Sequence, residues 1–118
     1  MKLTADIAVG LVALLHIYFL ILEMFLWTRP FGRRTFGLTE QFAHASKSLA
    51  ANQGLYNGFL AAGLIWGLAL GPAGKTIQYF FLGCVIVAGA FGAATVNRRI
   101  LWIQAAPAGV AFALVWLT

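Results

Sequence analysis

Four long apolar segments occupy most of this 118-residue chain and leave little sequence between them. A helix that crosses a bilayer needs about 20 predominantly apolar residues. Four windows qualify, at residues 5–27, 49–70, 77–96 and 100–117. The connections at 71–76 and 97–99 are short enough to be tight turns, and only 28–48 is a sizeable loop. The sequence therefore predicts an all-α protein, a four-helix transmembrane bundle in which residues 1–118 form a single integral-membrane domain.

Composition excludes a soluble monomer. Hydrophobic residues make up 62% of the chain and charged residues only 9%, whereas a soluble domain has about 25% charged residues. The net charge of +5 does not come with a soluble basic face carrying exposed aromatic residues, which nucleic-acid binding would need. The first apolar segment is too long for a cleaved signal peptide and lacks a cleavage site. We therefore expect it to be retained, and we expect a lipid bilayer, not nucleic acid, as the partner.

Basic residues are divided unequally between the two sides of the expected bundle. The side of the termini has only Lys2 and Lys75. The other side has Arg29, Arg33, Arg34, Lys47, Arg98 and Arg99. Cytoplasmic loops of membrane proteins carry an excess of Lys and Arg. The first and third connections are therefore expected in the cytoplasm, with both termini on the extracytoplasmic side of a plasma membrane.

Small residues recur at four-residue spacing and predict where helices approach one another. The stripes consist of Gly54, Gly58 and Ala62, of Cys84, Ala88 and Gly92, and of Ala105, Gly109 and Ala113. They fit a compact bundle and equally fit contacts between copies, so we expect a homo-oligomer, either a dimer or a trimer. Pro107 is expected to kink the last helix, because its ring clashes with the carbonyl of Ile103 and it lacks an N–H group.

The loop at 28–48 contains two features of its own. Thr39 can cap a helix that begins at Glu40, and no proline or glycine follows until Gly54, so the second helix is expected to span 40–70. Before it, the sequence TRPFGRRTFG mixes arginines with phenylalanines. This mixture favours contact with anionic lipid headgroups, and binding of an acidic ligand is the alternative.

Polar residues inside the apolar segments are the clearest functional signal. Glu23 and His16 lie in the run LLHIYFLILEMFLW, where burying a carboxylate costs several kcal/mol unless it is neutralised or paired. Being seven residues apart, they share one face of a helix. Further polar residues are expected at the cytoplasmic half of the bundle, namely Asn52, Gln53, Tyr56, Asn57 and Gln104. We predict a polar cavity with Glu23 and His16 as candidate catalytic residues and the others binding a substrate; the alternative is a hydrogen-bonded network between helices.

Three sequence blocks together carry a resemblance to a known family. LLHIYFLILEMFLW, TRPFGRRTFG and LAANQGLYNGFLAAGLIWG make the chain similar to the bacterial membrane family catalogued as domain of unknown function 1304. The resemblance covers nearly the whole chain, and AANQGLYNGF is its specific block. It implies a small protein of the bacterial inner membrane and groups Glu23 with Asn52, Gln53 and Asn57, but it assigns no activity.

Two better-understood groups resemble the chain more weakly. The membrane-associated proteins of eicosanoid and glutathione metabolism have a second helix that extends into the cytoplasm, and HASKSLAANQGLYN is similar to it in placement. Their Arg-Ala-His-x-Asn pattern is absent, because Ser48, Leu49 and Ala50 stand where Arg, Ala and His would precede Asn52. The small multidrug transporters have four helices and a single membrane glutamate in helix 1. Glu23 would be the counterpart, although it lies nearer the boundary.

Three functions are open at this point. The first is a membrane-embedded enzyme or binder of an amphipathic or lipophilic small molecule, with Glu23 as general acid or base. The second is a proton-coupled transporter in which Glu23 exchanges protons for a cation, and the third is a non-catalytic membrane assembly protein. The sequence indicates no metal site and identifies no cofactor, and it leaves open whether the protein is an enzyme.

Overall fold

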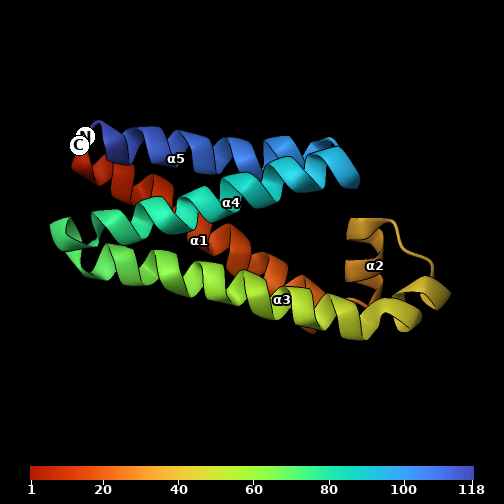
Figure 1. Cartoon of the computed structure of the whole chain (residues 1–118). Helices are drawn as coiled ribbons and strands as arrows, with labels where there is room; N and C mark the ends of the chain where they lie inside the picture. Colours follow the sequence, from red (N-terminus) through yellow and green to blue (C-terminus); the bar gives the residue numbers. More distant parts are fainter. The chain divides into compact units, whose positions relative to one another are not determined.

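The structure, a computed structural model, describes all 118 residues and contains helices but no strands (Figure 1). The elements are α1 (Lys2–Met24), α2 (Pro30–Phe36), α3 (Glu40–Ala69), the 3₁₀ turn η1 (Gly71–Gly74), α4 (Lys75–Thr95), the π-helical segment η2 (Leu101–Ala105) and α5 (Ala106–Trp116). The all-α prediction is confirmed. The chain forms two compact units, which are described separately. The first unit contains Met1–Leu14 and Leu60–Thr118, and the second contains Leu15–Phe59.

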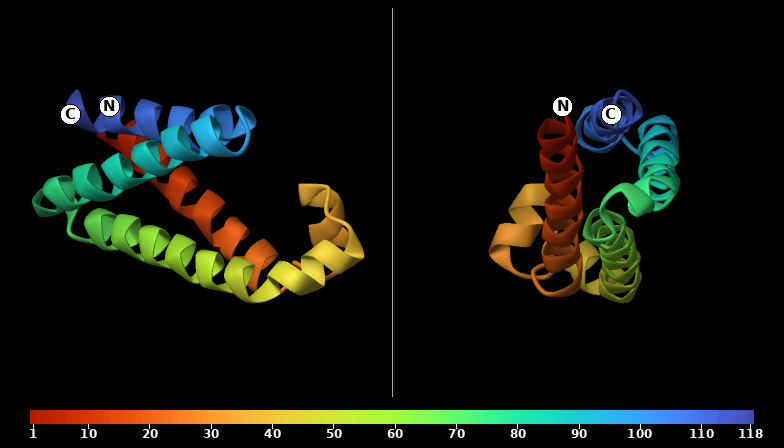
Figure 2. Two further views of the ribbon diagram at one scale, coloured as in Figure 1. Left: turned by 45° about the vertical axis from the view of Figure 1, so that its right-hand side comes forward. Right: turned by 90° about the vertical axis from the view of Figure 1, so that its left-hand side faces the viewer.

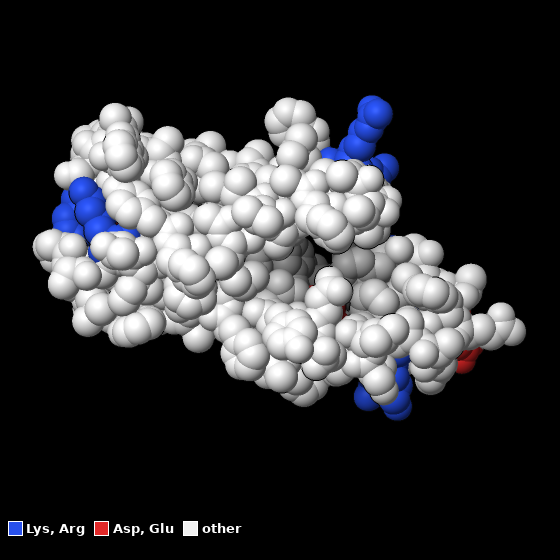
Figure 3. Space-filling model, viewed as in Figure 1, with Lys and Arg blue, Asp and Glu red and all other residues white.

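Two helical segments are long and apolar enough to cross a membrane, by length and composition. They are Lys2–Met24 and Gly71–Thr95. The helix Leu101–Trp116 is apolar but shorter, and α3 is interrupted by polar residues such as Asn52 and Asn57. Two of the four predicted spans therefore meet this criterion. On the face shown in Figure 3, Lys and Arg form small separate patches, and most of the surface is uncharged.

The first unit has an apolar core built from short and branched side chains. Its buried members are Ala5, Val9, Val12, Ala13, Leu64, Leu82, Val85, Ala108, Ala111 and Val115. Glycines bring the helices close: a Cβ at Gly89 would lie 2.6 Å from the backbone nitrogen of Ala105, and one at Gly63 would overlap the ring of Phe81. Figure 2 shows both chain ends lying beside each other at one end of this unit.

The expected small-residue stripes are only partly the ones that the structure uses. Gly54 and Gly58 do pack against neighbouring side chains, but Ala62 on the same stripe is exposed. In the first unit the close contacts of α3 come from Gly63 and Gly67, one position further along. The spacing was therefore informative, but the sequence did not show which face would be turned inward.

The last apolar segment is irregular before Pro107. In η2 the helix is π-helical, and the backbone N–H of Ala106 donates to the carbonyl of Leu101. In a regular α-helix the ring of Pro107 would clash with the carbonyl of Ile103, and the π-helical turn widens the helix at this point. The irregularity expected at Pro107 thus takes the form of a π-helical segment.

The loop expected at 28–48 contains a short helix that the sequence analysis missed. Pro30 is at the start of α2, and Gly37 ends it with φ of 66°, a left-handed conformation that glycine adopts without strain. The predicted cap of α3 is confirmed, because Thr39 Oγ1 accepts a hydrogen bond from the backbone N–H of Phe42 at 3.1 Å. α3 begins at Glu40, as expected.

Candidate functional site

The centre of the candidate site is the carboxyl group of Glu23, in the last turn of α1. The side chain of Asn57 on α3 donates a hydrogen bond from Nδ2 to Glu23 Oε1 at 2.5 Å. The side-chain amide of Gln53 also interacts with the carboxyl group of Glu23. Glu23 is 6% exposed and Asn57 9% exposed. The Asn57 amide therefore holds the carboxyl group in a largely buried position, and a second neutral amide, that of Gln53, interacts with it.

No basic side chain neutralises this carboxyl group. The one ion pair in the structure joins Lys2 and Asp6, in the first unit. An amide donor satisfies a carboxyl oxygen but contributes no formal positive charge. Glu23 is thus held in place by hydrogen bonds alone, which leaves its charge or its proton available for a further partner.

Glycines in α3 explain why the amides can reach Glu23. A Cβ at Gly54 would lie 2.7 Å from Met24 Cγ and 3.1 Å from Glu23 Cβ. A Cβ at Gly58 would lie 2.7 Å from Leu20 Cδ1. Because neither glycine has a side chain, α3 packs directly against the end of α1 in this unit. Gln53 and Asn57, one helical turn apart, are thereby brought to the same carboxyl group.

His16 lies about two turns before Glu23 on α1. It is fully buried, and its ring meets that of Phe19 edge-on with 5.5 Å between the ring centres. Burial of an imidazole among apolar side chains serves packing as readily as catalysis. The catalytic role of His16 remains a prediction.

Two other predicted residues of the second unit do not join the carboxyl–amide cluster of Glu23, Gln53 and Asn57. Asn52 is exposed, and Tyr56 is 55% exposed with its ring beside that of Phe59. Gln104 is half-buried in η2, in the first unit. Of the seven predicted residues, Glu23 and Asn57 are joined by a direct hydrogen bond, and the amide of Gln53 interacts with the same carboxyl group. The roles of Asn52, Tyr56 and Gln104 remain predictions.

Residues beside the cluster were missed by the sequence analysis. Leu20 and Met24 fill the space over Gly58 and Gly54. One turn beyond Glu23, the indole Nε1 of Trp27 donates to Ser46 Oγ at 3.0 Å, and its ring packs on Phe36 at 5.0 Å. The four-residue spacing from Leu20 to Met24 was a usable signal, since it marks the face of α1 that meets α3. Trp27 ties the start of α3 to the segment that follows α1.

No group of three or more His, Cys, Asp or Glu side chains is placed to hold a metal ion. The chemistry that the site can perform with its own side chains is therefore hydrogen bonding and, at Glu23, proton exchange.

Fold and site together define a small all-α protein of apolar helices with a buried carboxyl–amide cluster. The chain matches, over residues 10–116, the family described as protein of unknown function (DUF1304), and it belongs to this family. It is 31% identical over 96 residues to the uncharacterized protein YpaA of Lactococcus lactis subsp. lactis (strain IL1403), covering 80% of this chain and 81% of that protein. No solved structure matches the chain. The matched region contains the whole carboxyl–amide cluster.

Proposed function

We propose that this protein is a multi-pass protein of the bacterial inner membrane that binds a lipophilic or amphipathic small molecule at the carboxyl group of Glu23. The observation that carries the proposal is a buried carboxyl group, inside an apolar helix, with amide donors and no cationic partner. An ionisable side chain at such a position is costly, and in membrane helices it usually marks a ligand or ion site. A structural hydrogen bond alone could come from a less costly side chain.

The proposed topology has four membrane crossings, with both termini on the extracytoplasmic side. Lys2–Met24 and Gly71–Thr95 supply two of them. The other two are the apolar end of α3 and the helix Leu101–Trp116. Polar side chains are tolerated in a crossing where they are covered by protein or line a site, and Asn57 is covered. The excess of basic residues on the first and third connections supports this orientation.

The proposed ligand combines a polar group with an apolar part. Gln53 interacts with Glu23 but is itself exposed, so it connects the buried carboxyl group to the surface of the second unit. Tyr56 and Phe59 expose aromatic surface nearby on α3. A polar group of the ligand would meet Gln53 and Glu23, and its apolar part would lie along these rings. Glu23 could then serve as general acid or base, if the protein is an enzyme.

Association of copies is part of the same proposal. Asn52 and Tyr56 are four residues apart and exposed on one face of α3. An amide exposed to lipid would lack hydrogen-bond partners, and contact between helices in a membrane commonly supplies them. A dimer or trimer in which this face meets a second copy would satisfy Asn52.

The test is native mass spectrometry of the protein released from nanodiscs made with lipids of the expression host. The wild-type protein is compared with Glu23→Gln, and the matched control is Glu40→Gln, which changes an exposed glutamate at the start of α3. We expect a defined small molecule on the wild type and the control and its loss from Glu23→Gln. The same bound mass, or none, on all three proteins would contradict the proposal and favour a structural or proton-carrying glutamate.

A further inference from the structure

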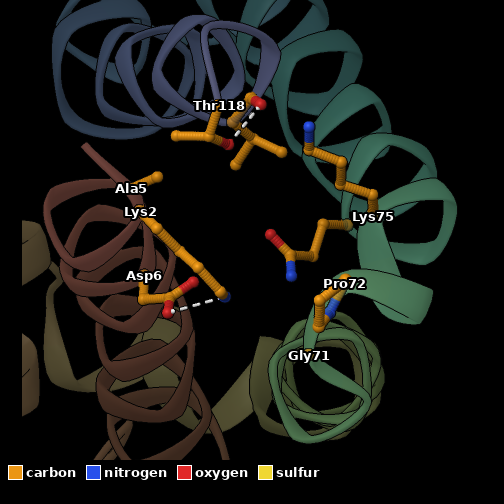
Figure 4. Close-up of a pocket in the computed structure, with 9 residues that line it drawn as sticks. Lys2, Ala5, Asp6, Gly71, Pro72, Lys75 and Thr118 are labelled. Carbon is orange, nitrogen blue, oxygen red and sulfur yellow. Dashed lines mark hydrogen bonds and ion pairs between the residues drawn. The ribbon is translucent and has the colours of Figure 1, made fainter.

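A separate pocket lies in the first unit, at the end where the two chain termini meet. Its volume is about 180 Å³, and its polar lining consists of Lys2, Asp6, Lys75, Gln78 and Thr118. Figure 4 shows that Lys2 and Lys75 approach it from opposite sides, from α1 and α4. None of these residues belongs to the carboxyl–amide cluster around Glu23.

The charges around this pocket favour an anion. Lys2 Nζ pairs with Asp6 Oδ2 at 3.2 Å, and this is the only ion pair, so Lys75 has no carboxylate partner. The charged side chains of the lining, two lysines and one aspartate, have a net formal charge of +1. α1 begins at Lys2 and α4 at Lys75, but α5 ends at Trp116 beside the same pocket, so the helix dipoles offset one another and the lysines carry the positive charge.

Gln78 forms one wall of the pocket and is held in a fixed position. This side chain is only 4% exposed, and its Nε2 donates to the carbonyl of Gly67 at 3.2 Å. Gly67 has no side chain, and a Cβ there would lie 2.7 Å from Gln78 Cγ. The carboxamide is thus fixed before any ligand arrives, which reduces the entropy lost on binding.

The depth of the pocket in a membrane follows from the ends of the helices. Both candidate spans, Lys2–Met24 and Gly71–Thr95, begin at this pocket. The ring of Tyr79 lies 5.0 Å from that of Phe112 and 6.0 Å from that of Trp116. Tyrosine and tryptophan are enriched at the boundary between membrane and water. The pocket therefore lies at the level of lipid headgroups, if the proposed membrane location is correct.

We propose that this pocket binds the phosphate group of an anionic lipid headgroup. Its volume is below the 300–1,000 Å³ or so typical of sites that enclose a drug-sized molecule, but it suits a single headgroup whose acyl chains remain outside. Lys75 supplies an unpaired positive charge for the phosphate group. Lys2 supplies a second positive charge, which it shares with Asp6. Gln78 forms a polar wall with a fixed side chain. This proposal relies on the membrane location but not on a ligand at Glu23.

The test measures lipid adducts by native mass spectrometry on the full-length protein in a non-ionic detergent. The probes are short-chain phosphatidylglycerol, short-chain phosphatidylcholine and inorganic phosphate. Lys75→Gln is compared with the wild type and with Lys47→Gln, a control at an exposed lysine of the second unit. We expect phosphatidylglycerol binding to fall about five- to tenfold in Lys75→Gln, as loss of one interfacial charge implies, and to stay unchanged in Lys47→Gln.

Further variants and probes keep the result decisive. Lys2→Gln should weaken phosphatidylglycerol binding as well, and it replaces Lys75→Gln if that variant does not fold by circular dichroism. Glu23→Gln should retain the lipid, which separates this site from the one proposed at Glu23. Equal phosphatidylglycerol binding by all variants, equal binding of phosphatidylcholine, or saturation by inorganic phosphate without lipid binding would overturn the proposal.

Discussion

The two units bury different kinds of side chain. The core of the first unit is apolar, and its one buried polar residue, Gln78, bonds to the backbone carbonyl of Gly67. The second unit buries His16, Glu23 and Asn57. A buried amide that satisfies a backbone carbonyl serves the fold, whereas a buried carboxyl group costs far more than the bond it makes. The contrast places the buried ionisable group, which is the candidate site at Glu23, in the second unit.

Glycine substitution in the first unit tests how far its stability depends on close packing. Gly89→Ala should destabilise the protein by about 2 kcal/mol, because the added methyl group would overlap the backbone of Ala105. Gly83→Ala, on the same helix, is the control: nothing lies within 4 Å of its Cβ position. It should stabilise α4 by about 0.5–1 kcal/mol. Chemical unfolding in mild detergent measures both, and equal effects would refute close packing at Gly89.

Removal of the amide partner tests the buried carboxyl group of the second unit. Asn57→Leu should cost about 1–2 kcal/mol, because Glu23 then keeps a buried oxygen without this donor. The exposed Asn52→Leu should change stability by less than about 0.5 kcal/mol. The double variant Glu23→Leu/Asn57→Leu should be more stable than the sum of the two single changes predicts. Strict additivity would show that the two residues are not coupled.

The matching experiment in the first unit concerns Gln78. Gln78→Leu removes the hydrogen bond to the Gly67 carbonyl and should cost about 1 kcal/mol. Gln78 is also proposed to form a wall of the headgroup pocket. Lipid binding in that pocket should therefore weaken in Gln78→Leu, while any ligand at Glu23 should remain bound. Thermal unfolding measures the loss of stability, and native mass spectrometry measures lipid binding. Loss of the ligand at Glu23 in this variant would contradict the prediction that the two sites are independent.

The smallest effect is expected at Trp27. Trp27→Phe keeps an aromatic ring against Phe36 but loses the hydrogen bond to Ser46. A side-chain bond at a partly exposed position is worth about 0.5 kcal/mol. Thermal unfolding should therefore shift only slightly, and a change as large as that of Asn57→Leu would mean that the second unit depends on Trp27 more than on its buried cluster.

Local signals in the sequence predicted the fold class and several helix ends. Thr39 predicted the start of α3 through its capping oxygen, and this required no knowledge of tertiary structure. Pro30 and Gly37 carry an equally local signal for α2, at its start and at its end. The last helix differs, because Pro107 indicates an irregularity but does not indicate that a π-helical segment precedes it.

The site was predictable in its residue types but not in its pairing. Depth and helical spacing grouped seven residues, and the structure joins Glu23 with Gln53 and Asn57. Asn52 differs from Gln53 by one position and is turned to the exterior. That choice depends on how α3 is rotated about its axis, which Gly54 and Gly58 fix by packing against α1. Rotation of a helix that is polar on several faces cannot be deduced from its pattern alone.

The π-helical segment before Pro107 also sets the register of the residues that follow it. A π-helical turn holds one residue more than an α-helical turn can, so every later side chain points in a different direction than an uninterrupted helix would give it. With this offset Ala108, Ala111 and Val115 reach the core, whereas Leu101, Trp102 and Ile103 are exposed. Deleting one residue within Leu101–Ala105 would convert the π-helical turn to a regular α-helical turn and leave the core-facing stripe of α5 close to its present direction, because the widened turn holds that extra residue. A regular turn of unchanged length would instead rotate the stripe by about 100°. The widened turn therefore keeps the residues that follow it directed at the core.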